Sequence, residues 1–194
     1  DNLDNIINEY VVPIYKSNDI LCIAESALAI IQNRLVHQQN IYPSYAAKLF
    51  CQFPDHLSSL ATPCGMQVLI DEIGILKILY AGFIGFIFRY FFKTRGMFYT
   101  IAGTQSKLID DISGTLSPYD KSIVLGPTNL SKTINHIYQK FNIKLAIVDV
   151  NDIERVDVLG SYSSSDNNFI CKMLKKNPSG NGNEQTPFIL LRKN

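Results

Sequence analysis

The spacing of apolar residues along this chain predicts both helices and strands. Over residues 3–11, apolar side chains recur at every third or fourth position, which predicts an amphipathic helix that Pro13 ends. The same spacing predicts three further helices, over 45–50, over 130–141 after a Thr-Asn pair that can cap it, and over 166–174 with Asp166 as its cap.

Continuous apolar runs predict strands between these helices. The predicted strands cover 19–24, 97–102, 143–150, 156–160 and 187–192. The run over 143–150 is rich in β-branched residues and predicts a strand that is buried on both faces. Asp149 therefore stands near the end of a buried strand.

The strongest apolar signal is a helix predicted over 73–92. Its length is close to that of a membrane span, but Lys77 and Arg89 leave only a short uncharged run between them. Small residues at Ala81, Gly82 and Gly85 allow another helix to approach closely. We expect this helix to lie in the core or in a dimer interface, with membrane contact as the alternative.

Charge and cysteine content narrow the class of protein. With 18 basic and 17 acidic residues the net charge is +1, and no basic stripe indicates nucleic-acid binding. The four cysteines are widely spaced and lack zinc-site spacing, so we expect reduced thiols in a cytoplasmic protein. Because the chain begins at Asp1, we expect it to be a single domain over 1–194 that is partial at its N-terminus. The polar segment 175–186 predicts a flexible loop.

Two acidic turns follow predicted strands. Asp110 and Asp111 lie in the turn over 109–114, and Asp149, Asn151 and Asp152 lie where the buried strand ends. Carboxylates delivered from strand ends suit a hard divalent cation, which takes oxygen ligands and keeps waters for a phosphate. Acidic residues at loop ends are also commonly just solvated, so the residue types alone leave both interpretations open.

A third polar junction lies at Glu25-Ser26, between the strand over 19–24 and the helix that follows. The unpaired N–H groups of a helix N-terminus can receive an anion there, although a serine cap without a ligand is an equal alternative. The chain has neither a P-loop nor a Rossmann glycine motif. A bound nucleotide would therefore need a carboxylate-held metal and scattered basic residues for its phosphates.

The order of these segments resembles the γ-glutamyl ligases of coenzyme F-420, and especially the bacterial ligase-like branch of that family. The resemblance covers nearly the whole chain and is carried by six segments: 20–34, 109–113, 123–127, 147–151, 156–160 and 182–187. It implies an α+β fold with a mixed β-sheet and flanking helices, of the γ-glutamyl ligase type, in an intertwined homodimer.

The resemblance also implies an activity and a site. Family members use GTP with Mg²⁺ or Mn²⁺ to phosphorylate a substrate carboxylate, which an amine, L-glutamate in the family, then converts into an amide. The family's metal-binding turns match Asp110 and Asp149, with Asp111 and Asp152 as further ligands. Nucleotide or substrate contacts are implied for Ser26, Arg34, Asn151 and Glu184, and no catalytic residue is assigned.

An alternative function follows from a difference within segment 25–34. The family has two lysines in this segment that could touch phosphate, and this chain has neither. The alternative is a non-catalytic nucleotide- or ligand-binding relative, or a membrane-associated one, that keeps the fold.

Overall fold

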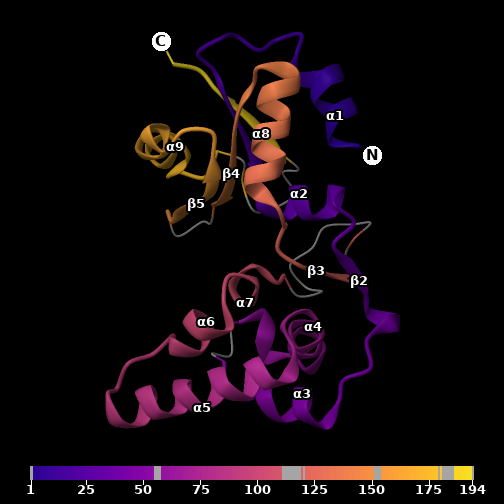
Figure 1. The fold of residues 1–194 in the computed structure, drawn as a ribbon, viewed down its shortest axis with the longest axis vertical. Coiled ribbons are helices and arrows are strands. Elements are labelled where there is room, and N and C mark those ends of the chain that lie inside the picture. Colours follow the sequence, from indigo (N-terminus) through magenta and orange to yellow (C-terminus); the bar gives the residue numbers. More distant parts are fainter. Residues whose placement is uncertain are drawn as a thin grey trace. The chain divides into compact units, whose positions relative to one another are not determined.

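The computed structural model describes residues 2–54, 58–110, 119, 121–150, 154–178, 180 and 186–193 (Figure 1). The chain divides into two units, each with its own core. Unit 1 consists of residues 1–33 and 127–194, and unit 2 consists of residues 34–126. Asp111, Asn151, Asp152 and Glu184 lie outside the described residues, as do residues 179 and 181–185 of the loop predicted over 175–186.

Unit 1 is built on a four-stranded mixed sheet in the order β5-β4-β1-β6. Its strands are β1 (Ile20–Ala24), β4 (Lys144–Val150), β5 (Val156–Ser161) and β6 (Phe188–Leu191). β1 runs parallel to β4, and both outer strands run antiparallel to their neighbours. The expectation of an α+β fold with a mixed sheet and flanking helices is confirmed, as are four of the five predicted strands.

Alternating side chains of the central strands supply two separate cores, because successive residues of a strand point to opposite faces. Leu21 and Ile23 of β1 pack with Leu145 and Ile147 of β4 on one face, beneath three helical segments. These segments are α1 (Leu3–Ile6) with the π-helix Ile7–Val11, α2 (Glu25–Ile31) and α8 (Leu130–Phe141). On the other face, Cys22, Ala146 and Val148 pack against α9 (Asn167–Leu174), so the sheet is covered on both sides (Figure 1).

The ends of α8 show how local sequence sets its limits. Asn129 precedes the helix and Asn142 follows it, both in the left-handed conformation with φ of 54° and 55°. Asparagine tolerates this conformation better than most residues. No side-chain capping hydrogen bond is made at Asn129, so the helix over 130–141 is confirmed but its predicted side-chain cap is wrong. Likewise, α9 begins after Asp166 as predicted, without a side-chain cap.

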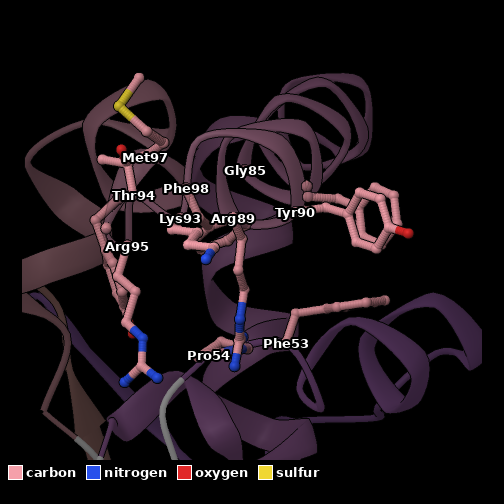
Figure 2. A pocket seen from close by; sticks show the side chains of 14 residues that line it. Phe53, Pro54, Gly85, Arg89, Tyr90, Lys93, Thr94, Arg95, Met97 and Phe98 are labelled. Atoms are coloured by element: carbon pink, nitrogen blue, oxygen red, sulfur yellow. The ribbon is translucent and has the colours of Figure 1, made fainter.

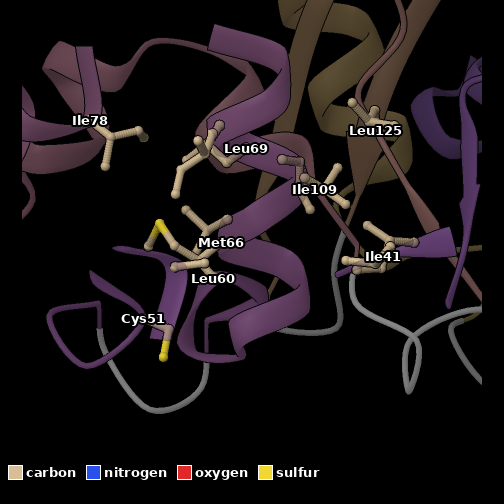
Figure 3. Close-up of a cluster of buried hydrophobic side chains, with 12 residues drawn as sticks. Ile41, Cys51, Leu60, Met66, Leu69, Ile78, Ile109 and Leu125 are labelled. Atoms are coloured by element: carbon tan, nitrogen blue, oxygen red, sulfur yellow. The ribbon is translucent and has the colours of Figure 1, made fainter. Parts of the chain in front are cut away.

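Unit 2 is mainly helical and has its own buried cluster, in which Leu60, Met66 and Leu69 lie together with Ile109 and Ile78 nearby (Figure 3). Its helices are α3 (Tyr45–Phe50), α4 (Pro63–Ile73), α5 (Ile75–Phe91), α6 (Met97–Ala102) and α7 (Gln105–Leu108). Short 3₁₀ turns lie at Gln38–Asn40 and Ser59–Ala61 in this unit and at Ser164–Asp166 in unit 1. Two short antiparallel strands, β2 (Leu35–His37) and β3 (Ser122–Val124), complete the unit.

The strand predicted over 97–102 is wrong, because this segment is helix α6. Its aromatic and β-branched residues favour a strand locally. Two glycines with positive φ, Gly96 and Gly103, bracket it and limit it to a short helix. Phe98 packs against Gly85 of α5, and the Tyr99 hydroxyl lies 2.8 Å from Ser58 Oγ, so tertiary contacts override the local preference.

The predicted apolar helix over 73–92 forms as α5, separated from α4 by Gly74 with a φ of 86°. Within unit 2 only Ile78 and Ala81 of this helix are fully buried. The expectation that the helix lies in the core is therefore wrong for most of its length. In the part of the chain that the structure describes, no helix combines the length and apolar character needed to cross a membrane.

Candidate functional site

Four segments of unit 1 meet at one edge of its sheet. β1 and β4 are parallel and in register through the pair Ala24–Val148, so the residues that follow each of them lie at the same edge. Glu25 and Ser26 follow β1, and Asp149 follows Val148. The carboxyl ends of adjacent parallel strands are the usual ligand-binding edge of a sheet that contains them.

The two outer strands begin at this same edge because they run antiparallel. Val156, the first residue of β5, pairs with Val150 at the end of β4. On the other side, the Ala24 N–H donates to the carbonyl oxygen of Pro187 at 2.9 Å, just before β6. Segments that are far apart in the sequence are therefore adjacent in this unit.

Asp149 has an acidic neighbour that the sequence analysis missed. In the β4–β5 ladder Asp149 pairs directly with Asp157, which places both side chains on the same face of the sheet. Partial burial raises the pKa of Asp149 above its ordinary value, and repulsion from Asp157 raises it further, while Arg155 acts in the opposite direction. Arg155 Nη2 lies 2.8 Å from Asp157 Oδ2.

The paired carboxylates have the donor chemistry that Mg²⁺ or Mn²⁺ requires. Two oxygen-rich groups that repel each other are relieved when a divalent cation lies between or beside them, and such cations keep several water ligands in addition. Among the described residues no group of three or more His, Cys, Asp or Glu side chains gathers in a metal-binding arrangement. Of these described side chains, Asp149 and Asp157 could contribute to a cation site at this edge, with waters or substrate oxygens as further ligands.

Glu25 and Ser26 open α2 beside this pair. Glu25 is 8% exposed, and its carboxylate accepts a hydrogen bond from the Ser26 backbone N–H. The N-cap position is Ala24, which makes no side-chain capping bond, so Ser26 does not cap this helix. The predicted placement of Glu25 and Ser26 at the carboxyl end of a strand is confirmed, and nothing tests the predicted substrate contact of Ser26.

Asp110 belongs to unit 2, whereas Asp149 belongs to unit 1. The Asp110 backbone forms an isolated antiparallel bridge with Val124, in which each N–H donates to the other carbonyl oxygen at 2.9 Å and 3.1 Å. Helices α6 and α7 lead into it in place of the predicted strand. The proposed joint role of Asp110 and Asp149 in metal binding stays a prediction.

Arg34 also lies in unit 2 and is held by protein groups. Its Nε donates to the carbonyl oxygen of Gly126 at 2.6 Å, and its Nη2 lies 2.6 Å from Glu72 Oε1. Gln105 Oε1 lies 3.4 Å from the same Nη2. These bonds tie the start of β2 to α4, α7 and the segment after β3, which is a structural role that sequence reasoning did not suggest.

None of the four cysteines forms a disulfide bond in this structure. Cys22 and Cys51 are buried, and Cys64 and Cys171 are half-buried. Cys64 lies in the first turn of α4, where the Thr62 hydroxyl caps the helix by accepting from the Gly65 N–H at 3.0 Å. The cysteine positions agree with the expectation of separate, unbridged thiols.

Comparison of the chain with models of known protein families found no match, and neither did comparison with curated proteins.

Proposed function

We propose that this chain is a divalent-cation-dependent ligase of the γ-glutamyl type, which uses GTP to join an amine to a carboxylate, with a coenzyme F-420 precursor as the acceptor. The observation that supports the proposal best is the meeting of Glu25-Ser26, Asp149, Asp157 and Pro187 at the carboxyl edge of the β1–β4 pair. This edge is where open sheets with parallel strands bind ligands.

Within this proposal, Asp149 and Asp157 hold the cation. The cation, Mg²⁺ or Mn²⁺, supplies charge neutralisation on the nucleotide phosphates and alignment of the transferred group. A cation bound beside Asp149 would favour loss of its proton, against the partial burial and the repulsion from Asp157 that raise its pKa. The pair is thus suited to bind metal more strongly as pH rises.

The reaction has two steps in this class of chemistry. An oxygen of the acceptor carboxylate attacks the γ-phosphorus of GTP, which forms an acyl phosphate and releases GDP. The amine nitrogen of the donor then attacks the acyl carbon, inorganic phosphate leaves with the C–O bond electrons, and the nitrogen loses a proton to give the amide. The protein's main contributions to such a reaction are positioning and electrostatic stabilisation.

Isothermal titration of GTP in the presence of Mg²⁺ tests the binding half of this proposal. We expect wild type to bind and Asp149→Asn to bind roughly ten- to a hundredfold more weakly. Asp71→Asn is the matched control, because Asp71 is an exposed aspartate of α4 whose side chain accepts a hydrogen bond from Gln67. Failure of wild type to bind, or equal affinity of wild type and Asp149→Asn, would contradict the proposal.

Phosphate release in the presence of GTP, Mg²⁺, L-glutamate and a carboxylate acceptor tests the catalytic half. Release that depends on the acceptor supports a ligase. Nucleotide binding without phosphate release for any acceptor would favour the non-catalytic relative, which the absence of the family's two lysines in segment 25–34 also suggests.

A further inference from the structure

The outward side of α5 carries a continuous apolar surface that no described residue covers. Phe83 is 62% exposed and Tyr90 is 71% exposed. The exposed members recur every three or four residues and therefore lie along one side of the helix. We call them the aromatic stripe; they are Leu76, Leu79, Tyr80, Phe83, Phe86 and Tyr90, with Phe91 and Phe92 at its end.

The opposite side of α5 fixes this orientation. Ile78 and Ala81 are fully buried in unit 2. Gly82 lets Phe50 approach, and Gly85 lets Phe98 of α6 approach so closely that an added Cβ would lie 3.3 Å from Phe98 Cβ. The helix is thus packed by its small residues, which leaves its large apolar side chains in solvent. An apolar surface of this size on an otherwise polar exterior indicates an interaction site.

The charges within the segment that carries the stripe have one sign. Between Gly74 and Ile109 the sequence has five basic residues and no acidic residue. Lys77, Arg89, Lys93 and Arg95 are all exposed, and none of them forms an ion pair with a described residue. The stripe therefore ends in three cations, Arg89, Lys93 and Arg95, that form no ion pair with the part of the chain that the structure describes.

These cations stand at the rim of a pocket of about 540 Å³. Phe53, Pro54 and Phe98 contribute apolar surface to its lining. Figure 2 shows the side chains of Arg89 and Arg95 extending in the same direction. An apolar hollow with a cationic rim suits a molecule that has an acyl chain and a phosphate headgroup.

We propose that α5 and residues 92–96 dock unit 2 onto a bilayer surface that contains anionic phospholipid. The helix lies in the plane of the interface, with the aromatic stripe among the headgroups and Arg89, Lys93 and Arg95 on lipid phosphates. A second copy of the chain meeting it through the same surface fits less well, because α5 and residues 92–96 contain no acidic residue that could pair with these cations. This activity is independent of the proposed ligase function.

Vesicle flotation tests the proposal with the full chain. We expect binding to vesicles of phosphatidylcholine mixed with phosphatidylserine and much weaker binding to phosphatidylcholine alone. Substituting Arg89→Gln, Lys93→Gln and Arg95→Gln together should weaken binding to the mixed vesicles by roughly a hundredfold, since each basic residue contributes separately at an anionic surface. The triple variant Lys172→Gln, Lys175→Gln and Lys176→Gln, which removes the same charge from unit 1, should bind like wild type.

A second pair of variants separates the apolar contribution from the charges. Phe83→Ser with Phe86→Ser should abolish flotation, whereas Tyr42→Ser with Tyr45→Ser, which changes two exposed aromatic residues outside the stripe, should not. Equal binding to both vesicle types, or no binding to either, would overturn the proposal. It would also be overturned if sedimentation showed a wild-type dimer that Phe83→Ser with Phe86→Ser converts to a monomer, because the stripe would then be a self-association interface.

Discussion

Asp149 and Asp157 are paired across the β4–β5 ladder, so two carboxylates meet at the edge of the sheet where β1 and β4 end. Arg155 offsets part of this repulsion through its ion pair with Asp157. Like charges directly opposite each other in a sheet destabilise it. A fold that keeps such a pair gives up stability for it, which is common at functional sites.

The raised pKa of Asp149 should make the free energy of unfolding depend on pH. The pKa of Asp149 in the folded chain is raised above its ordinary value of 3.8, so the folded state holds this proton more tightly than the unfolded state. The contribution of Asp149 to the free energy of unfolding is therefore largest below the unfolded pKa and is lost as pH rises through the folded pKa.

Replacing Asp149 with Asn should remove that loss. At neutral pH we expect Asp149→Asn to raise the free energy of unfolding by about 0.5 kcal/mol. At acidic pH we expect the substitution to leave the free energy of unfolding unchanged. Urea denaturation of both proteins across this pH range measures the difference. Asp157→Asn should gain less, since it also removes the ion pair with Arg155. A variant less stable than wild type at neutral pH would show that repulsion from Asp157 does not destabilise the folded chain at this position.

Arg34 should be needed for the stability of unit 2. Its guanidinium bonds Gly126 and Glu72 at 2.6 Å each, and the Arg34 side chain is only 19% exposed. Arg34→Met should lower the free energy of unfolding by about 2 kcal/mol, because hydrogen bonds to a charged group are lost and Glu72 loses its partner. Arg34→Lys should recover only part of this loss, since lysine cannot donate in two directions from a planar group. An unchanged thermal midpoint in both variants would favour a role confined to ligand contact.

Two glycines of unit 2 should respond oppositely to alanine. A Cβ at Gly126 would lie 2.6 Å from Leu108 Cβ, so Gly126→Ala should destabilise the chain by about 1–3 kcal/mol through overpacking. At Gly82, inside α5, the nearest atom would be Phe50 Cε1 at 3.5 Å, which is an ordinary contact. Gly82→Ala should therefore stabilise by about 0.5–1 kcal/mol through helix propensity. Thermal denaturation of both variants measures whether each substitution raises or lowers the midpoint. A gain in stability for Gly126→Ala would refute the close packing described.

Cys22 should resist alkylation in the folded chain. Burial raises the pKa of its thiol to about 12, so its thiolate fraction at neutral pH is roughly a thousandfold below that of a thiol with an ordinary pKa. Peptide mass spectrometry after iodoacetamide treatment should show Cys171, which is half-buried, modified well before Cys22. Labelling of both at the same rate in native buffer would mean that the β1 region opens easily.

Local patterns predicted the elements that local physics determines. β1, β4, β5 and β6 follow apolar runs, and α3 occupies the predicted span Tyr45–Phe50. The segment 97–102 was mispredicted because Gly96, Gly103 and packing on α5 determine its conformation, and none of these can be weighed from strand preference alone.

The candidate site was predicted only in part, for a similar reason. The sequence placed Ser26 and Asp149 at strand ends, which local patterns can do. Asp157 was overlooked because its role depends on the register between β4 and β5, which residue types do not reveal. Asp110 and Arg34 were grouped with Asp149 by their order in the chain, yet both lie in unit 2.

β1, one of the two inner strands of the unit 1 sheet, is synthesised early, but both of its neighbouring strands are synthesised much later. β1 pairs with β4 and β6, and the whole of unit 2 is encoded between β1 and β4. During synthesis, residues 34–126 can therefore collapse onto their own core while β1 still lacks both neighbours. Pairing over such long sequence separations is slow, and an unpaired apolar strand is prone to aggregate. If translation pauses after residues 34–126 but before β4, β1 stays unpaired and exposed while unit 2 has already folded.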